Sequence, residues 1–244
     1  MYPFIITFLS GISTILGIIP TYFNSKYKDK IINFSLSFSS GIMISISLFS
    51  LIPESLHYIG INYINILLLL IFINIGLIIS TYTDKLISKR INNNSLYKLG
   101  IVSIIALVLH NIPEGITTFL TTSNNLRVGL TLSLAIALHN IPEGISIAVP
   151  IYYSTKSHKK AFIYTFISGF SELIGGLFSY IFLSNYINNF ILSIILGITS
   201  GIMIQISLFE LIPNSLKYRN YKDTFMGFIL GFIIMIICIF IFKI

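Results

Sequence analysis

The hexapeptide His-Asn-Ile-Pro-Glu-Gly occurs twice in this chain of 244 residues, at 110–115 and at 139–144. Residues four apart on a helix project from the same face, and residues three apart lie close to that face. Each copy therefore gathers one His, one Asn and one Glu, and the six potential ligands are His110, Asn111, Glu114, His139, Asn140 and Glu143. Imidazole, amide and carboxylate groups together suit Zn²⁺, Fe²⁺, Mn²⁺ or Co²⁺ better than Cu⁺ or Mg²⁺. We interpret the doubled motif as a transition-metal site.

The surroundings of the motif are apolar. The chain is 55% hydrophobic and 9% charged with a mean hydropathy of +0.91, whereas soluble domains carry about 25% charged residues. Ionisable groups are costly inside a bilayer, so their concentration here indicates a function. A third carboxylate, Glu172, lies among small residues in a later apolar run and is the seventh candidate ligand. A proton relay or a structural polar network is the alternative interpretation of these residues.

Eight apolar runs are long enough to cross a bilayer whose hydrocarbon core is about 30 Å thick. They predict an all-α integral membrane protein with a single transmembrane domain over 1–244. The expected helices cover about 3–23, 31–53, 61–82, 98–120, 127–151, 161–183, 188–212 and 223–243. No basic segment precedes the first run and no small-residue cleavage site follows it, so we expect a span there and not a removable signal peptide.

Lys and Arg are distributed unevenly between the two sides of these spans. Thirteen of the fifteen lie in the loops after the odd-numbered spans: Lys26, Lys28, Lys30, Lys85, Lys89, Arg90, Lys98, Lys156, Lys159, Lys160, Lys217, Arg219 and Lys222. The other two are Arg127 and Lys243. Cytoplasmic loops collect positive charge, so both termini should face outward from the cell membrane. The basic residues form no stripe with interleaved aromatic residues, so nucleic acid is not an expected partner.

Two segments 160 residues apart are nearly identical. Ser40–Leu56 and Ser200–Leu216 agree at fourteen of seventeen positions. They fall in spans two and seven, which cross the membrane in opposite directions, and this is the pattern of an inverted repeat in transporters. Spans four and five form a second related pair. The chain therefore predicts a 3+2+3 arrangement, in which two related triplets flank a central hairpin that carries the polar residues.

Other residues capable of metal ligation are placed less clearly. Glu210 lies near the end of span seven, where a role on the path of the metal and a solvated helix end are both open. Met43 and Met203 occupy matching repeat positions, and packing is the favoured role of both. Three further residues lie at a span end or in a basic loop, where solvated side chains are common, and are not assigned to the site: Glu54, His57 and His158.

The whole chain resembles the ZIP family of metal transporters, most closely its bacterial ZupT-type branch. The resemblance rests on the eight spans, the paired hexapeptides, Ser-Gly-x-x-Glu in span six and the related second and seventh spans. It implies a binuclear site, in which Glu114, His139 and Glu143 hold zinc and His110 is a further ligand in some members. For iron or a second metal it implies a set made of Asn111, Glu114, Asn140, Glu143 and Glu172. Many relatives have a histidine-rich loop between spans three and four, but 83–97 contains no His here, which puts a metal-sensing role for this loop in doubt.

We therefore expect a transporter that takes up Zn²⁺, and with it Fe²⁺, Mn²⁺ and Co²⁺, as substrates and not as cofactors. No catalytic residue is expected, because the His-x-x-x-Glu spacing lacks the HExxH arrangement that places a base between two His ligands. An intramembrane zinc-dependent hydrolase and a divalent-cation channel are the alternatives. Divalent metal ions and the lipid bilayer are the expected partners. The sequence leaves the preferred metal, the direction of transport, proton coupling and the oligomeric state open, with a homodimer as one alternative.

Overall fold

The computed structural model describes residues 1–23, 25–88, 95–183 and 188–242, and every element within these ranges is helical. Eight helical segments are long and apolar enough to cross a membrane, as the sequence predicts. The protein is therefore an all-α, multi-pass membrane protein. Two of the thirteen basic residues that support the predicted orientation, Lys89 and Arg90, lie outside the described residues, as does Lys243 on the other side.

The eight segments are built as follows. The first is α1 (Tyr2–Ile12) continued by the 3₁₀ helix η1 (Ser13–Tyr22), and after the short turn η2 (Ser25–Tyr27) the second comprises α2 (Lys28–Ile46), η3 (Ser47–Leu51) and α3 (Ile52–Ile59). The third, fourth and fifth are α4 (Tyr63–Ser88), α5 (Ser95–Asn124) and α6 (Leu126–Thr155). The sixth is α7 (His158–Phe178) with η4 (Ser179–Leu183), the seventh comprises α8 (Asn189–Gln205), η5 (Ile206–Leu211) and α9 (Ile212–Leu216), and the eighth is α10 (Tyr221–Phe242).

Most helices extend beyond the apolar runs that predict them, because polar residues at both ends continue the helix or cap it. Ser157 accepts a hydrogen bond from the backbone N–H of Lys160 and begins α7, while Asn188 accepts one from the N–H of Ile191 and begins α8. Such side chains satisfy backbone donors that the first helical turn leaves unpaired. The helix ends in the structure therefore differ from the expected ones by several residues.

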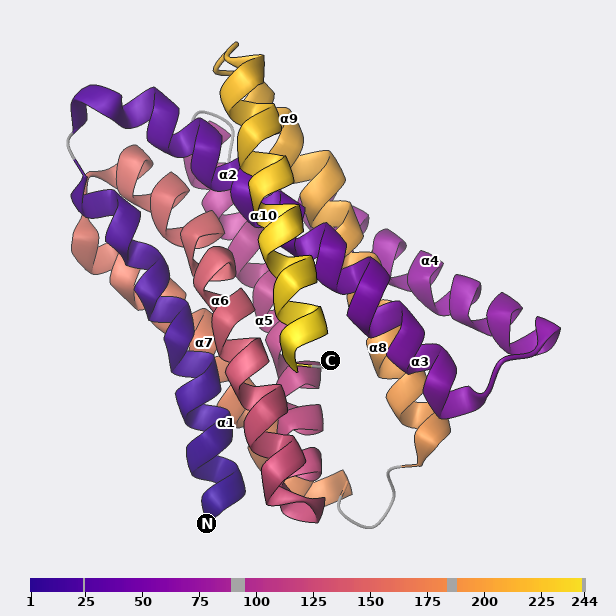
Figure 1. Ribbon diagram of the computed structural model, residues 1–244. Helices are drawn as coiled ribbons and strands as arrows, with labels where there is room; N and C mark the ends of the chain where they lie inside the picture. The colour runs from indigo at the N-terminus through magenta and orange to yellow at the C-terminus, as the bar shows by residue number, and fades with distance from the viewer. Residues whose placement is uncertain (24, 89–94, 184–187, 243–244) are drawn as a thin grey trace.

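The two repeat segments share one irregularity. Both contain a π-helical turn, η3 in the first copy and η5 in the second, and in both a short α-helix with proline in its first turn follows. The α2–α3 segment descends in Figure 1 while the α8–α9 segment rises beside it, so the copies are antiparallel. The matched turns support an inverted repeat through backbone geometry, in addition to sequence identity.

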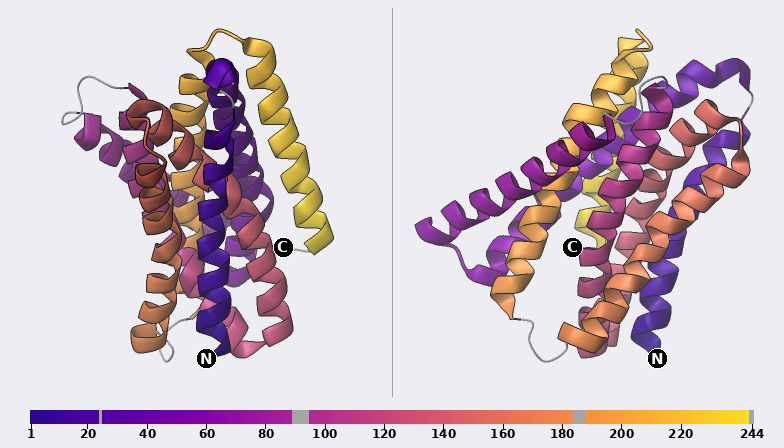
Figure 2. Two further views of the ribbon diagram at one scale, coloured as in Figure 1. Left: turned by 90° about the vertical axis from the view of Figure 1, so that its left-hand side faces the viewer. Right: turned by 180° about the vertical axis from the view of Figure 1, so that it is seen from behind.

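The helices pack in two groups. One consists of α1 with η1, α5, α6 and α7, and the other of α2, α3, α4, α8, α9 and α10. Figure 1 shows α1, α6 and α7 together at the left and α3, α4 and α8 together at the right, and the view from behind in Figure 2 agrees. The first helix thus packs with the central hairpin and not with the rest of its own sequence triplet. The packing interleaves the two triplets.

The turns from η1 into α2, from α6 into α7 and from α9 into α10 all lie at the upper end of Figure 1. The N-terminus and the turn between α5 and α6 lie at the lower end. We call these the basic end and the opposite end, because the first three turns carry nine of the thirteen clustered Lys and Arg residues whereas the α5–α6 turn carries Arg127 alone.

Candidate metal centre

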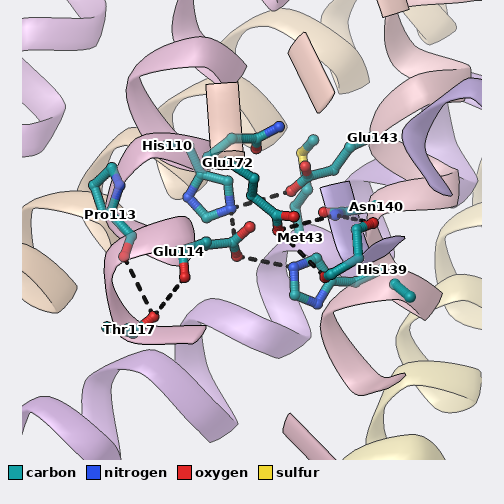
Figure 3. Close-up of polar contacts among 12 residues, drawn as sticks. Met43, His110, Pro113, Glu114, Thr117, His139, Asn140, Glu143 and Glu172 are labelled. Carbon is teal, nitrogen blue, oxygen red and sulfur yellow. Dashed lines mark hydrogen bonds and ion pairs between the residues drawn. The ribbon is translucent and has the colours of Figure 1, made fainter. Parts of the chain in front are cut away.

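The two hexapeptides meet in the interior of the first helix group (Figure 3). Because α5 and α6 are antiparallel neighbours, His110 and Glu114 on α5 approach His139 and Glu143 on α6. The Nε2 atom of His139 lies 2.8 Å from Oε1 of Glu114. The Nε2 atom of His110 lies 2.9 Å from the same oxygen and 3.2 Å from Oε1 of Glu143. The sequence prediction that the two motifs form one cluster is therefore met by the structure.

The spacing of these atoms fits a metal ion closely. His110, Glu114 and His139 each offer one ligand atom, and these atoms lie within 4.8 Å of one another. Bonds from zinc to nitrogen or oxygen are about 2.0–2.2 Å long, so ligand atoms around a tetrahedral ion stand roughly 3.3–3.5 Å apart. The His–Glu contacts of the cluster, at 2.8–3.2 Å, are shorter than this spacing, so these atoms would move apart to admit an ion.

The two asparagines are held so that their oxygens stay free. Nδ2 of Asn111 donates to the carbonyl oxygen of Ser168 at 2.9 Å, and Nδ2 of Asn140 donates to the carbonyl oxygen of Ser10 at 3.1 Å and to Oε1 of Glu172 at 3.2 Å. With each amide nitrogen so engaged, each Oδ1 atom has no hydrogen-bond partner among the described residues. An amide oxygen oriented in this way is available as a metal ligand.

The three carboxylates of the cluster are buried. Glu114 is 5% exposed, and Glu143 and Glu172 are fully buried. In each of the three, the Oε2 atom has no hydrogen-bond or ion-pair partner among the described residues. Each of these carboxylates has its contacts through Oε1 only, and a buried polar atom left without a partner costs about 1–3 kcal/mol. A divalent cation at this position would offset that cost.

Glycines let the helices approach at the centre. A Cβ atom on Gly115 would collide with the backbone of Glu172, and one on Gly144 would collide with the carbonyl oxygen of Thr14. The absence of a side chain at these two positions lets α7 and η1 pack directly against the hairpin. Pro113 and Pro142 lie inside the continuous helices α5 and α6.

The remaining candidates lie apart from the cluster or beside it. Met43 and Met203 are fully buried in the apolar core, in agreement with packing roles, although Met43 also lies beside Glu143 in Figure 3. Glu210 is 8% exposed, so it is not a solvated residue at a helix end. It lines a pocket with Asp84 and Lys98 at the basic end. Glu54 is half-buried and lines a cavity that also reaches Glu114.

Sequence reasoning missed the residues that orient the ligands. Ser10 on α1 accepts from Asn140 through its carbonyl oxygen and donates through its hydroxyl to Glu172 Oε1 at 3.4 Å. Ser168 on α7 holds Asn111. Both are hydroxyl residues in the middle of apolar spans, but serine is so frequent in these helices that position alone did not single them out.

Buried imidazole, carboxylate and amide groups at the crossing of transmembrane helices define the chain as a membrane protein with a candidate transition-metal centre. Residues 91–239 match the family described as ZIP Zinc transporter. The chain is 34% identical to the zinc transporter ZupT of Clostridium perfringens over 98% of its own length and 95% of the relative's. It is 34% identical to ZupT of Campylobacter jejuni, covering 95% and 93%, and 32% identical to ZupT of Escherichia coli, covering 96% and 94%. The chain therefore belongs to the ZIP zinc transporter family.

Proposed function

We propose that the protein takes up Zn²⁺ across the cell membrane through the cluster on α5, α6 and α7, with Fe²⁺, Mn²⁺ and Co²⁺ as further substrates. The observation that carries this proposal is the contact of two imidazoles with Glu114 Oε1, together with the unpartnered oxygens around it. These atoms form a set of potential metal ligands, and the chain that carries them belongs to a family of zinc transporters. Metal ions are then the cargo of the protein and not its cofactors.

We further propose that the cluster holds two ions. One would be bound by Glu114, His139 and Glu143, with His110 as a fourth ligand, because His110 contacts both carboxylates. The other would be bound by the oxygens of Asn111, Asn140 and Glu172, with Glu114 and Glu143 bridging the two positions. The unpartnered Oε2 atoms of all three glutamates support this division, since each bridging carboxylate then has a second oxygen to offer.

Alternating access is the proposed mechanism. The centre lies wholly in the group formed by α1, α5, α6 and α7, and the second helix group lies beside it. We propose that these two packed groups, rather than the two sequence triplets, are the bodies that move, because helices that bury surface together tend to move together. The 3+2+3 repeat would then supply the symmetry that makes the two access states similar in energy.

The membrane arrangement is part of the proposal. The basic end would face the cytoplasm and both termini would face outward, following the positive-inside rule. Exposed Leu, Ile and Phe side chains on α4 and α10 would contact lipid. A homodimer is the assembly that we propose to test by chemical cross-linking in native membranes.

Two other functions are less well supported. A zinc-dependent hydrolase would need a general base beside metal-bound water, whereas all three buried glutamates of the cluster are used here as ligands. A divalent-cation channel would use the same ligand types, but its flux would rise with metal concentration without saturating. The uptake assay below separates these possibilities.

The test is uptake of radioactive zinc into proteoliposomes that contain the purified protein. We expect saturable uptake by the wild type and less than about one tenth of that rate for Glu143→Gln and His139→Ala, since changes to the ligands of a metal or to their supporting contacts cost about 10–100-fold. Asn74→Ala is the control, because it removes an exposed polar side chain of α4 in the other helix group, and its uptake should equal that of the wild type. Uptake by Glu143→Gln at the wild-type rate would exclude the proposed site. Competition by Fe²⁺, Mn²⁺ and Co²⁺ would then rank the substrates.

A further inference from the structure

A cavity extends from the metal centre toward the opposite end of the bundle, as far as Glu54. Glu114 and His139 form one part of its wall, and Ser50, Glu54 and Thr117 form another. The remaining wall is apolar and includes Ile136. The cavity thus joins two residues of the proposed zinc position to a carboxylate that belongs to a different helix group.

The order of the wall residues along their helices locates the cavity. On α5, Thr117 follows Glu114 toward the α5–α6 turn, and on α6, Ile136 precedes His139 after the same turn. Glu54 lies on α3, which continues α2 away from the basic loop that contains Lys28. The cavity therefore occupies the half of the protein between the centre and the opposite end, which the proposed orientation places outside the cell.

Glu54 is the one carboxylate besides Glu114 among the described residues that line this cavity. It is half-buried, and the hydroxyl of Tyr58 lies 3.5 Å from its Oε1 atom, a distance at which a hydrogen bond is weak. It has no ion pair with a Lys or Arg among the ion pairs of the described residues. Glu54 therefore lines the cavity without an ion pair to a Lys or Arg among the described residues.

The inverted repeat gives a second, independent observation. With the offset of 160 residues, Ser50 and Glu54 correspond to Glu210 and Asn214. Glu210 and Asn214 line a pocket at the basic end, with Asp84 as a further carboxylate in its wall. Equivalent positions of the two antiparallel copies thus line two cavities, one on each side of the centre. Each copy contributes one glutamate, Glu54 at the second of the two positions in the first copy and Glu210 at the first position in the second copy.

We propose that Glu54 is the capture residue of an outer vestibule, which binds the hydrated cation transiently and hands it to Glu114 and His139. The inference rests on the proposed transport function. A divalent ion entering an apolar-walled cavity loses water, and a carboxylate in the wall offsets that loss and raises the local concentration of cations. Steering by charges in a cleft changes association rates by about 10–1000-fold and weakens with ionic strength. Glu54 acts on capture and is not a ligand of the final site.

The test compares zinc uptake by wild type, Glu54→Gln and Glu54→Asp in proteoliposomes at two ionic strengths. We expect Glu54→Gln to raise KM for zinc about tenfold, to leave kcat within about twofold, and to flatten the dependence of kcat/KM on salt. Glu54→Asp, which keeps the charge, should restore most of the wild-type KM. Glutamine has the shape of glutamate, so a folding defect is not expected, and size-exclusion profiles of the three proteins should match.

A second variant tests whether charge or shape matters. Ser50→Glu combined with Glu54→Gln moves the carboxylate one turn toward the centre, to the position that Glu210 occupies in the other repeat copy, and should lower KM again. An unchanged KM in Glu54→Gln, a loss of kcat at unchanged KM, or no recovery in both charge-restoring variants would overturn the proposal. Failure of the transport function is a different result, because the wild type itself would then show no saturable uptake.

Discussion

Two adjacent glycines on α7 allow the packing of the metal centre to be tested with an internal control. Substitution of Gly175 by Ala would place a Cβ atom against the carbonyl oxygen of Ile112, 2.9 Å from its carbonyl carbon and 3.1 Å from its Cα atom. These are backbone atoms of α5, so they cannot rotate away. At Gly176 the nearest atom to an added Cβ would be Cγ2 of Thr7 at 3.4 Å, an ordinary van der Waals contact. One substitution therefore forces α5 and α7 apart, and the other does not.

The expected difference in melting temperature follows from what the two substitutions share and from what only one of them adds. Both replace Gly by Ala in a helix, which is favourable by about 0.5–1 kcal/mol. Only Gly175→Ala adds overpacking, at a cost of about 1–3 kcal/mol. Since one kcal/mol corresponds to about 2–4 °C for a chain of this size, Gly175→Ala should melt about 2–12 °C below Gly176→Ala. The separation of α7 from α5 should also draw Glu172, which is three residues away, from the other ligands.

Thermal unfolding in detergent, with and without zinc, measures both effects. A ligand that binds only the folded state stabilises it by RT ln(1 + [L]/Kd), so a tenfold rise in Kd removes about 1.4 kcal/mol of that stabilisation. We expect the zinc-induced rise in Tm to be smaller for Gly175→Ala than for Gly176→Ala by about 3–6 °C. Equal Tm values and equal zinc shifts for the two variants would refute the claim that direct backbone contact between α5 and α7 positions the site.

Two further predictions concern protons and a polar cluster outside the centre. Zinc binding should release protons, because His–Glu contacts share hydrogens that metal ligands must lose. Calorimetric heats should therefore vary with the ionisation enthalpy of the buffer, and identical heats in all buffers would contradict this. Glu143→Gln should show little heat at all. Asn33→Ala should destabilise the fold by about 2–4 kcal/mol in chemical unfolding, because the buried Oδ1 of Asn33 accepts from Ser215 Oγ at 2.5 Å and Thr224 Oγ1 at 2.7 Å and both hydroxyls lose a partner. Asn74→Ala, on the exposed face of α4, is the control and should change stability by less than about 0.5 kcal/mol.

The sequence predicts the spans and the core of the centre well, because both depend on local patterns. Apolar runs of span length specify membrane helices, and the four-residue spacing within each hexapeptide places His110 beside Glu114 whatever the rest of the fold does. The duplicated motif on an antiparallel hairpin then brings the second pair to the first. The Lys and Arg residues allow a prediction of the orientation in the membrane for the same reason, since the charge of a loop does not depend on which helices pack together.

The features that the sequence does not predict depend on contacts between helices that are distant in the chain. The approach of α1 to α6 and α7, which brings Ser10 to Asn140 and Glu172, has no local signature in a span as uniformly apolar as the first one. The π-helical turns in the repeat copies were likewise not predicted, because their sequences read as ordinary helix. Glu54 was interpreted as a solvated residue, since its position along α3 gives no indication of the cavity that four other spanning segments form with it.

The most direct test of a two-ion centre is to count zinc bound per chain by equilibrium dialysis and elemental analysis of the purified protein. The wild type should bind two ions per chain, and Glu172→Gln should bind one, because Glu172 is a ligand of the second position only. A single ion bound by the wild type, or two ions retained by Glu172→Gln with unchanged affinity, would contradict the account.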